Sequence, residues 1–307
     1  MNYYKRTADA LLQDLLDAFG AVLIEGPKWC GKTTTASQLA NSILRMQDPS
    51  MREEYLATAK TKPSILLKGD TPRLIDEWQD APMLWDAVRT TVDDRQIPGQ
   101  FILTGSNAVD KSQIHHSGAG RIARLRMLPM SLWESQESTG EVSLKELFNN
   151  PDYDIDGKMS KMTVEDLIFA ASRGGWPASL LARTPKAQLL VAKNYVQTIC
   201  SDDVSGIDGK KRDAKLTSMI LRAYARNVST LVKKKSLLDD VTSSGEVSCH
   251  VDTFDDYVSA LEKLFVIQNI SAWCPAIRSK TAIRSSVKRC FCDPSIPIAL
   301  LGLSPES

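Results

Sequence analysis

The sequence lacks any run of about 18 apolar residues, the length that a helix needs to cross a membrane. It also lacks the pattern of a secretory signal, because acidic residues interrupt the apolar positions of the N-terminal stretch and no cleavage site follows. Both absences favour a cytoplasmic protein with no membrane partner.

Cysteine pairs and an excess of one charge are absent as well. The six cysteines form no CxxC pair and have no regular spacing, which is typical of reduced thiols in a cytosolic protein. The formal net charge is +1 over 307 residues, so any contact with nucleic acid requires a local basic patch. The composition, 43% hydrophobic and 24% charged, is that of a globular protein long enough for several domains.

Short apolar segments alternate with amphipathic ones over residues 1–135. Because each is short and apolar, five segments predict buried strands: 21–25, 42–48, 73–78, 100–107 and 121–128. Segments with helical periodicity separate them, at 9–19, 32–42, 52–60 and 82–92. This alternation predicts an α/β domain with a mainly parallel sheet.

The remainder of the chain has a different composition. Residues 136–230 begin with a polar connection that contains one short helix near Leu144, and then become helical, which predicts a linker followed by a small helical domain. Residues 231–307 contain helices at 235–242 and 253–265, followed by two strand-like segments. This order is the outline of a winged helix.

The stretch GPKWCGKT at 26–33 has the spacing GxxxxGK[ST] between a predicted strand and a predicted helix, which is the context of a phosphate-binding P-loop. Backbone N–H groups of such a loop surround the β-phosphate, Lys32 supplies a positive charge to the β- and γ-oxygens, and Thr33 places its hydroxyl on Mg²⁺. Trp29 either covers the nucleotide or packs as an ordinary aromatic residue, and packing is favoured. The predicted nucleotide-binding residues are Gly26, Pro27, Lys28, Trp29, Cys30, Gly31, Lys32, Thr33 and Thr34.

A second motif, LIDEWQ, ends a predicted strand with two acids. We expect Asp76 to hold Mg²⁺ together with Thr33, and Glu77 to orient or deprotonate the attacking water. The alternative is an acidic strand end that faces solvent. No guanine-reading NKxD motif is present, so ATP is the expected nucleotide.

The strand FILTGSN ends in polar residues that a parallel sheet would bring close to the γ-phosphate or the water. We expect Thr104 or Ser106 to sense the phosphate, with Asn107 as the alternative. Further along, Arg121 follows a Gly-Ala-Gly loop and is the candidate for the cation that assists hydrolysis, a plain ion pair being the alternative.

The ordered segments GPKWCGKTTT, PRLIDEWQDAP, GQFILTGS, GAGRIARLRMLPMSLWES, GGWPAS and KRCFCDPSI closely resemble a bacterial family of AAA-type ATPases over nearly the whole chain. The resemblance implies an ATP-binding core, a helical lid and a winged helix. Longer members continue into a nuclease-like domain of unknown function, which we expect to be absent from a chain ending in LGLSPES. The resemblance also places Pro177 of GGWP against the adenine, the alternative being a simple helix break.

The predicted winged helix gives a mixed indication of DNA binding. Its second helix carries Asp252, Asp255, Asp256 and Glu262, the wrong charge for a surface that meets phosphates, and favours packing against the ATPase core instead. Basic residues that suit a wing tracking the DNA backbone, or a plain solvated face, are Lys233 to Lys235, Arg278, Lys280, Arg284, Lys288 and Arg289.

Taken together, the motifs predict an Mg-dependent ATPase that couples its nucleotide state to movement of a lid and a winged helix. The alternative is a nucleotide-gated switch with little turnover that binds DNA or protein. A protein partner or a second copy of the chain is also compatible with these motifs.

Overall fold

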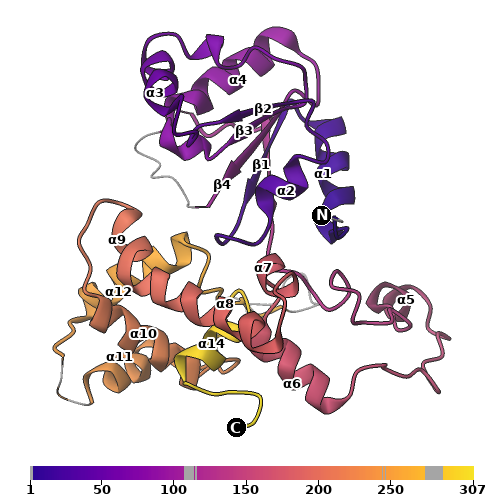
Figure 1. Cartoon of the computed structure of the whole chain (residues 1–307), viewed down its shortest axis with the longest axis vertical. Helices are drawn as coiled ribbons and strands as arrows, with labels where there is room; N and C mark the ends of the chain where they lie inside the picture. The colour runs from indigo at the N-terminus through magenta and orange to yellow at the C-terminus, as the bar shows by residue number, and fades with distance from the viewer. Residues whose placement is uncertain (1–2, 107–113, 115, 244, 246, 274–285) are drawn as a thin grey trace.

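The computed structural model describes residues 3–106, 114, 116–243, 245, 247–273 and 286–307. Figure 1 shows a sheet flanked by helices in the upper part of the molecule and a group of helices in the lower part. Within the described residues, no helix combines the length and the apolar character that crossing a membrane requires.

The sheet consists of five parallel strands in the order β2-β3-β4-β1-β5. The predicted α/β class with a parallel sheet is therefore confirmed. The strands are β1 (Ala21–Glu25), β2 (Ser42–Arg45), β3 (Arg73–Asp76), β4 (Phe101–Gly105) and β5 (Ile122–Arg126). The strand that precedes the P-loop is β1, which lies between β4 and β5.

Helices cover both faces of the sheet, and alternation along β1 explains why. Val22 and Ile24 pack with Leu12 and Leu16 of α1 (Thr7–Ala18), whereas Ala21 and Leu23 belong to the cluster that includes Trp85 of α4 (Met83–Arg95). Successive side chains of a strand point to opposite faces, so both faces of a continuously apolar strand are buried. The other elements of this part are α2 (Lys32–Ala36), α3 (Arg52–Thr61), η1 (Pro63–Ile65) and η2 (Trp78–Asp80).

The lower part is helical. Its elements are α5 (Leu144–Asn149), α6 (Val164–Arg173), α7 (Pro177–Leu180), α8 (Pro185–Thr198), the π-helical turn η4 (Ile199–Asp203), α9 (Val204–Gly206), α10 (Ala214–Arg226), α11 (Lys234–Thr242), α12 (Val251–Lys263) and α14 (Ser295–Leu300). The helices predicted near Leu144, at 235–242 and at 253–265 correspond to α5, α11 and α12. The two strand-like segments form isolated antiparallel bridges, Ile267 with Phe291 and Ile270 with Lys288.

One hydrophobic core serves this whole helical part. Its buried side chains extend from Trp176, through Tyr224 of α10 and Phe254 of α12, to Ile296 and Leu300 of α14. Helix α14, which was not predicted, packs against α6, α8 and α10. The end of the described chain is therefore built into the same core as the helices that follow residue 176.

Candidate nucleotide-binding site

Two glycines shape the loop between β1 and α2. Gly26 has φ +157°, and a Cβ atom there would lie 2.0 Å from the carbonyl oxygen of Met127. Gly31 has φ +99° and caps the N-terminus of α2. No side chain fits the first position and few tolerate the second, so the spacing of the two glycines reflects a geometric requirement of the loop.

Lys32 lies folded back on the loop. Its Nζ donates hydrogen bonds to the carbonyl oxygens of Gly26, at 3.0 Å, and Pro27, at 2.8 Å. Burial lowers the pKa of this lysine, although the neighbouring acids oppose the shift. The amine therefore sits in the mouth of the loop, where a phosphate group supplies the negative charge that a buried ammonium group requires.

Cys30 faces away from the loop mouth. Its side chain is fully buried, and burial raises the pKa of the thiol, so the thiol is a neutral packing group. Its backbone carbonyl accepts a hydrogen bond of 2.8 Å from the guanidinium of Arg6, which also donates to the carbonyl of Leu128 at 2.7 Å. Arg6, which the sequence analysis missed, ties the N-terminal segment to the loop.

Asp76 at the end of β3 accepts two hydroxyl hydrogen bonds on one oxygen. Thr33 donates to Oδ1 at 2.7 Å and Thr104 donates to the same atom at 2.6 Å. The second contact follows from the sheet, because Asp76 and Thr104 are register partners on adjacent parallel strands. Three residues from three separate motifs therefore meet at one carboxylate.

Glu77 has a separate set of partners. Its backbone is left-handed, with φ +56°, a conformation that costs energy for a residue with a side chain and is concentrated at functional sites. Its Oε2 accepts a hydrogen bond from Ser106 at 3.2 Å and another from the amide of Gln79. Gln79 is the last residue of LIDEWQ, and no role was predicted for it.

The amide oxygen of Gln79, Oε1, is buried and has no hydrogen-bond partner among the described residues. A buried, unsatisfied oxygen beside the candidate base is a local cost that a bound water or ligand donor would relieve. Of the three predicted sensing residues, Thr104 and Ser106 are thus both in the site, and Asn107 lies outside the described residues.

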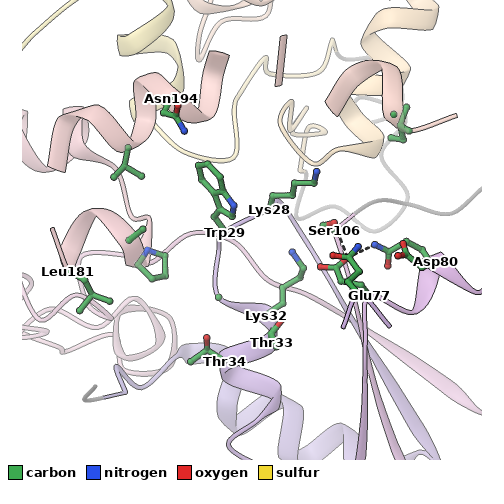
Figure 2. A pocket seen from close by; sticks show the side chains of 18 of the residues that line it. Lys28, Trp29, Lys32, Thr33, Thr34, Glu77, Asp80, Ser106, Leu181 and Asn194 are labelled. Carbon is green, nitrogen blue, oxygen red and sulfur yellow. Dashed lines mark hydrogen bonds between the residues drawn. The ribbon is translucent and has the colours of Figure 1, made fainter. Parts of the chain in front are cut away.

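A cavity of about 1270 Å³ lies between the sheet and helices α7 and α8 (Figure 2). Of the groups described above, Lys32, Thr33, Glu77, Gln79 and Ser106 line it, whereas Asp76 and Thr104 do not. The volume exceeds the range of ordinary small-molecule pockets and accommodates a nucleotide. The core side contributes residues 28, 29, 31–34, 47, 77, 79, 80 and 106. The helical side contributes Pro177, Leu181, Leu190, Val191, Asn194 and residues 206–209, among others. Gly26, Pro27 and Cys30, although part of the loop, do not line the cavity.

Two loop residues outside the fixed positions of the GxxxxGK[ST] pattern contact the helical part directly. The ring of Trp29 packs on Tyr195 of α8 with centroids 5.6 Å apart, and Tyr195 packs on Trp176 at 4.2 Å. Lys28 forms an ion pair of 2.5 Å with Asp203 of η4. Trp29 thus packs on an aromatic ring and also lines the cavity, with 46% of the residue exposed, so its position is compatible with both predicted roles.

The GGWP segment is anchored from the far end of the chain. Asp293 accepts a hydrogen bond from the backbone N–H of Gly175 at 2.8 Å, and Ser295 Oγ accepts one from the indole of Trp176 at 3.0 Å. Pro177 begins α7 directly after this anchor. Its Cγ lies 3.5 Å from the position that a Cβ on Gly31 would occupy, so the structure brings Pro177 close to the P-loop.

The comparisons with known proteins agree with this geometry. Residues 18–136 match the family model described as an AAA domain. Residues 18–136 are thus an AAA-type P-loop domain. Residues 164–307 match a second family model, described as a domain of unknown function, DUF8612.

Two mycobacterial proteins are similar to nearly the whole of this chain. Uncharacterized proteins of Mycobacterium tuberculosis and Mycobacterium bovis are each 25% identical to this chain over 309 residues, which is 97% of this chain and 60% of each of theirs. This chain therefore spans well under two thirds of their length. A Walker-type ATPase of Pyrococcus abyssi superposes with a TM-score of 0.55 at 12% identity, over 97% of this chain and 96% of that one, and so shares the fold.

Arg121 lies on the wrong edge of the AAA core for the predicted role. It directly precedes β5, at the amino end of the parallel sheet, whereas the P-loop follows the carboxyl end of β1. The length of a five-residue strand, roughly 15 Å, separates the two edges. Arg121 instead forms an ion pair of 2.7 Å with Asp93 of α4, which is the plain ion pair named as the alternative, and within its own chain it does not reach the P-loop.

The acidic helix α12 lies mainly among other helices, and Phe265, at the end of the predicted helix, contacts the AAA core through Arg126 of β5, whose guanidinium is 5.3 Å from the ring centroid. The helix packs against α9 and α10, and its acids have basic partners there. Asp256 pairs with Arg212 at 2.9 Å and with Lys210 at 2.7 Å, and Asp255 pairs with Lys234 at 2.7 Å. Of the basic residues predicted for a wing, Arg278, Lys280 and Arg284 lie outside the described residues.

Proposed function

We propose that this chain binds ATP with Mg²⁺ in the cavity between its AAA core and helices α7 and α8, and hydrolyses the γ-phosphate. The observation that carries the proposal is the meeting of Thr33 and Thr104 on one oxygen of Asp76, with Glu77 as the next residue. A P-loop hydroxyl, a strand-end carboxylate and an adjacent second acid are the parts that ATP hydrolysis requires.

The residues around Asp76 fit a magnesium ion. The hydroxyl of Thr33 and the carboxylate of Asp76 are hard oxygen donors 2.7 Å apart, and magnesium prefers one or two such protein ligands, with phosphate oxygens and waters completing its shell. When bound, the ion neutralises charge on the β- and γ-phosphates. Thr104 fixes the orientation of the carboxylate, because it donates to the same oxygen.

The remaining steps fall to side chains of the chain itself. Lys32 exchanges its two loop carbonyls for oxygens of the β- and γ-phosphates. Glu77 accepts a proton from the attacking water while the bond between the γ-phosphorus and the bridging oxygen breaks, giving ADP and phosphate. Ser106, which donates to Glu77, orients this base or follows the departing phosphate. Pro177 and Leu181 provide an apolar wall for the adenine.

We further propose that residues 1–135 form the ATPase core, 136–230 the linker and helical lid, and 231–307 a winged helix, and that closure on nucleotide moves the last two together. The shared hydrophobic core of residues 176–300 supports coupled movement, because helices that share a packed core move as a unit.

Two substitutions test the ATPase proposal. Lys32→Ala removes the charge in the loop mouth and abolishes ATP binding, measured by calorimetry or with a fluorescent nucleotide. Glu77→Gln keeps the size of the side chain and the binding affinity but removes the base, so phosphate release falls by about 100-fold or more. Unchanged turnover in the Glu77→Gln protein would show that another group activates the water.

A second candidate, a nucleotide-gated switch with little turnover, is favoured by one observation. Glu77 is held by two donors, Gln79 and Ser106, and a carboxylate held in this way is less free to turn toward an attacking water. Single-turnover measurements separate the candidates, because a switch retains bound ATP for many minutes. Duplex binding measured with and without ATP across a salt series then distinguishes a DNA partner, which requires a salt slope, from a protein partner.

A further inference from the structure

The positive charges that line the cavity suggest a role for a loop residue that phosphate binding alone does not require. Among the described residues of the cavity wall, Lys28 and Lys32 are the cations, whereas Glu77, Asp80 and Asp208 are acids. Arg121 lies at the opposite edge of the sheet and cannot contribute. A triphosphate in this cavity therefore has one candidate for a second lysine contact within the described chain, and that candidate is Lys28.

Lys28 is placed to reach the terminal phosphate. In Figure 2, Trp29 and Lys28 leave the loop in different directions: Trp29 points toward α8, and Lys28 toward the side of the cavity where Ser106 and Glu77 lie. Leu181 lies on the other side of Trp29. The apolar wall suits the base, so the side that holds Lys28 and Glu77 is the side of the γ-phosphate.

The present partner of Lys28 belongs to a different part of the fold. Asp203 lies on the π-helical turn η4, at 2.5 Å from the ammonium group. The lysine side chain is 39% exposed and Asp203 is 10% exposed, so the lysine is free to turn while the acid is held. A single π-helical turn within a helix is unusual and occurs frequently at functional sites.

We propose that Lys28 distinguishes triphosphate from diphosphate by exchanging Asp203 for the terminal phosphate, which frees η4 from the P-loop. This inference rests on the proposed function, because it requires a nucleotide in the cavity. A phosphate group carries more charge than a carboxylate and offers more acceptor oxygens, so the exchange favours the triphosphate state. ADP lacks the third phosphate and leaves the ion pair between Lys28 and Asp203 in place.

The exchange removes the charged link between loop and helices. The packing of Trp29 on Tyr195 is a second link, which has no charge and is independent of the phosphate. With ATP bound, α8 remains docked through the aromatic rings while η4 and α9 loosen. The nucleotide state is thereby converted into a local change at residues 199–206, which belong to the same core as α10 and α12.

The test compares affinities for ADP and for a non-hydrolysable ATP analogue in three proteins. Lys28→Met retains the length of the side chain without its charge, and weakens analogue binding about tenfold while ADP binding changes less than about twofold. Asp203→Asn removes the competitor for Lys28, and tightens analogue binding about threefold with ADP again unchanged. Lys28→Arg, which retains the charge, stays within about twofold of wild type for both nucleotides.

Hydrogen exchange provides a readout that is independent of affinity. In the wild-type protein, amides of residues 199–206 exchange faster with the analogue than with ADP, and in the Lys28→Met protein the two nucleotides give the same rate. Equal losses of affinity for both nucleotides in Lys28→Met would overturn the inference, because they would mean that Lys28 joins the loop to the helix in the same way whichever nucleotide is bound. Absence of nucleotide binding by the wild-type protein would instead refute the proposed function itself.

Discussion

Asp293 accepts a hydrogen bond from the backbone N–H of Gly175 at 2.8 Å, although 118 residues separate the two along the chain. The other oxygen of the same carboxylate accepts from the backbone and hydroxyl of Ser295, which in turn holds the indole of Trp176. Pro177 follows directly and lines the nucleotide cavity. One wall of the candidate active site therefore depends on a segment near the end of the described chain.

Asp293→Asn is expected to destabilise the protein by about 1–3 kcal/mol, because an amide replaces one acceptor oxygen with a donor that faces another donor. The same substitution should weaken nucleotide binding through displacement of Pro177. Urea denaturation and a nucleotide titration measure the two effects. A variant with wild-type stability would show that water or backbone movement replaces the lost contact.

The pH dependence of this effect has a defined sign. Burial raises the pKa of Asp293 above its ordinary value, although its hydrogen bonds oppose the shift. The folded protein thus holds the proton more tightly than the unfolded chain, so the associated stability is complete below the ordinary aspartate pKa and is lost as the pH rises through the folded value. The stability advantage of wild type over Asp293→Asn therefore shrinks with rising pH. An advantage that grows with pH would mean that the hydrogen bonds outweigh burial.

The sequence allowed the strands and the P-loop to be predicted because both depend on local patterns. AVLIE is apolar at every position but the last, and the fixed residues of the GxxxxGK[ST] pattern lie within eight positions of one another. The role of Asp293 could not be predicted, since its partner Gly175 is fixed only by tertiary packing. The KRCFCDPSI segment resembles a segment of a known family, but this resemblance does not indicate which residues the segment contacts.

The position of Arg121 in the fold is a second feature that depends on more than a local pattern. The sequence correctly indicated a strand after this residue, but the direction in which a strand runs decides which edge its first residue occupies. In a parallel sheet that edge is the one away from the P-loop. Gln79 was missed for a related reason, because its contact with Glu77 depends on the left-handed turn at Glu77, which no pattern in LIDEWQ predicts.

Thr104→Val tests the hydrogen bond to Asp76. Valine has nearly the shape of threonine but cannot donate, so Asp76 loses one of the two donors that fix its Oδ1. We expect ATP hydrolysis to fall by about tenfold or more, with a stability loss of about 1 kcal/mol. Phosphate release and thermal denaturation measure the two. Thr104→Ser retains the hydroxyl and should retain most of the activity; equal losses in both variants would attribute the effect to packing.

Arg121→Ala tests the corrected position of this arginine. Its partner Asp93 is on α4 and the arginine side chain is 48% exposed, so the loss of the ion pair should cost less than about 1 kcal/mol. Hydrolysis measured at low protein concentration should remain within about twofold of wild type, and Asp93→Ala should behave in the same way. A hydrolysis rate that rises more steeply than protein concentration, and that only Arg121→Ala abolishes, would instead place this arginine at the site of a neighbouring copy.

Gly175 and Gly206 form a matched pair for the last prediction. Neither has a left-handed backbone, so alanine strains neither position through φ. They differ in space: a Cβ on Gly175 would lie 2.0 Å from the carbonyl oxygen of Met130, whereas a Cβ on Gly206 meets nothing within 4 Å. The carbonyl of Gly175 also accepts a hydrogen bond of 2.7 Å from the Met130 N–H, so the two backbone segments cannot move apart without losing it.

Gly175→Ala is therefore expected to destabilise the protein by more than about 2 kcal/mol, because backbone shifts forced by overpacking cost about 1–3 kcal/mol and the lost hydrogen bond adds to that. Gly206→Ala, on the helical turn α9, is expected to stabilise it by about 0.5–1 kcal/mol, through the better helix propensity of alanine. Chemical denaturation of both proteins beside wild type provides the measurement. Opposite signs would show that close approach of the GGWP segment to Met130 is what requires glycine at 175, whereas equal small effects would mean that this approach relaxes at little cost.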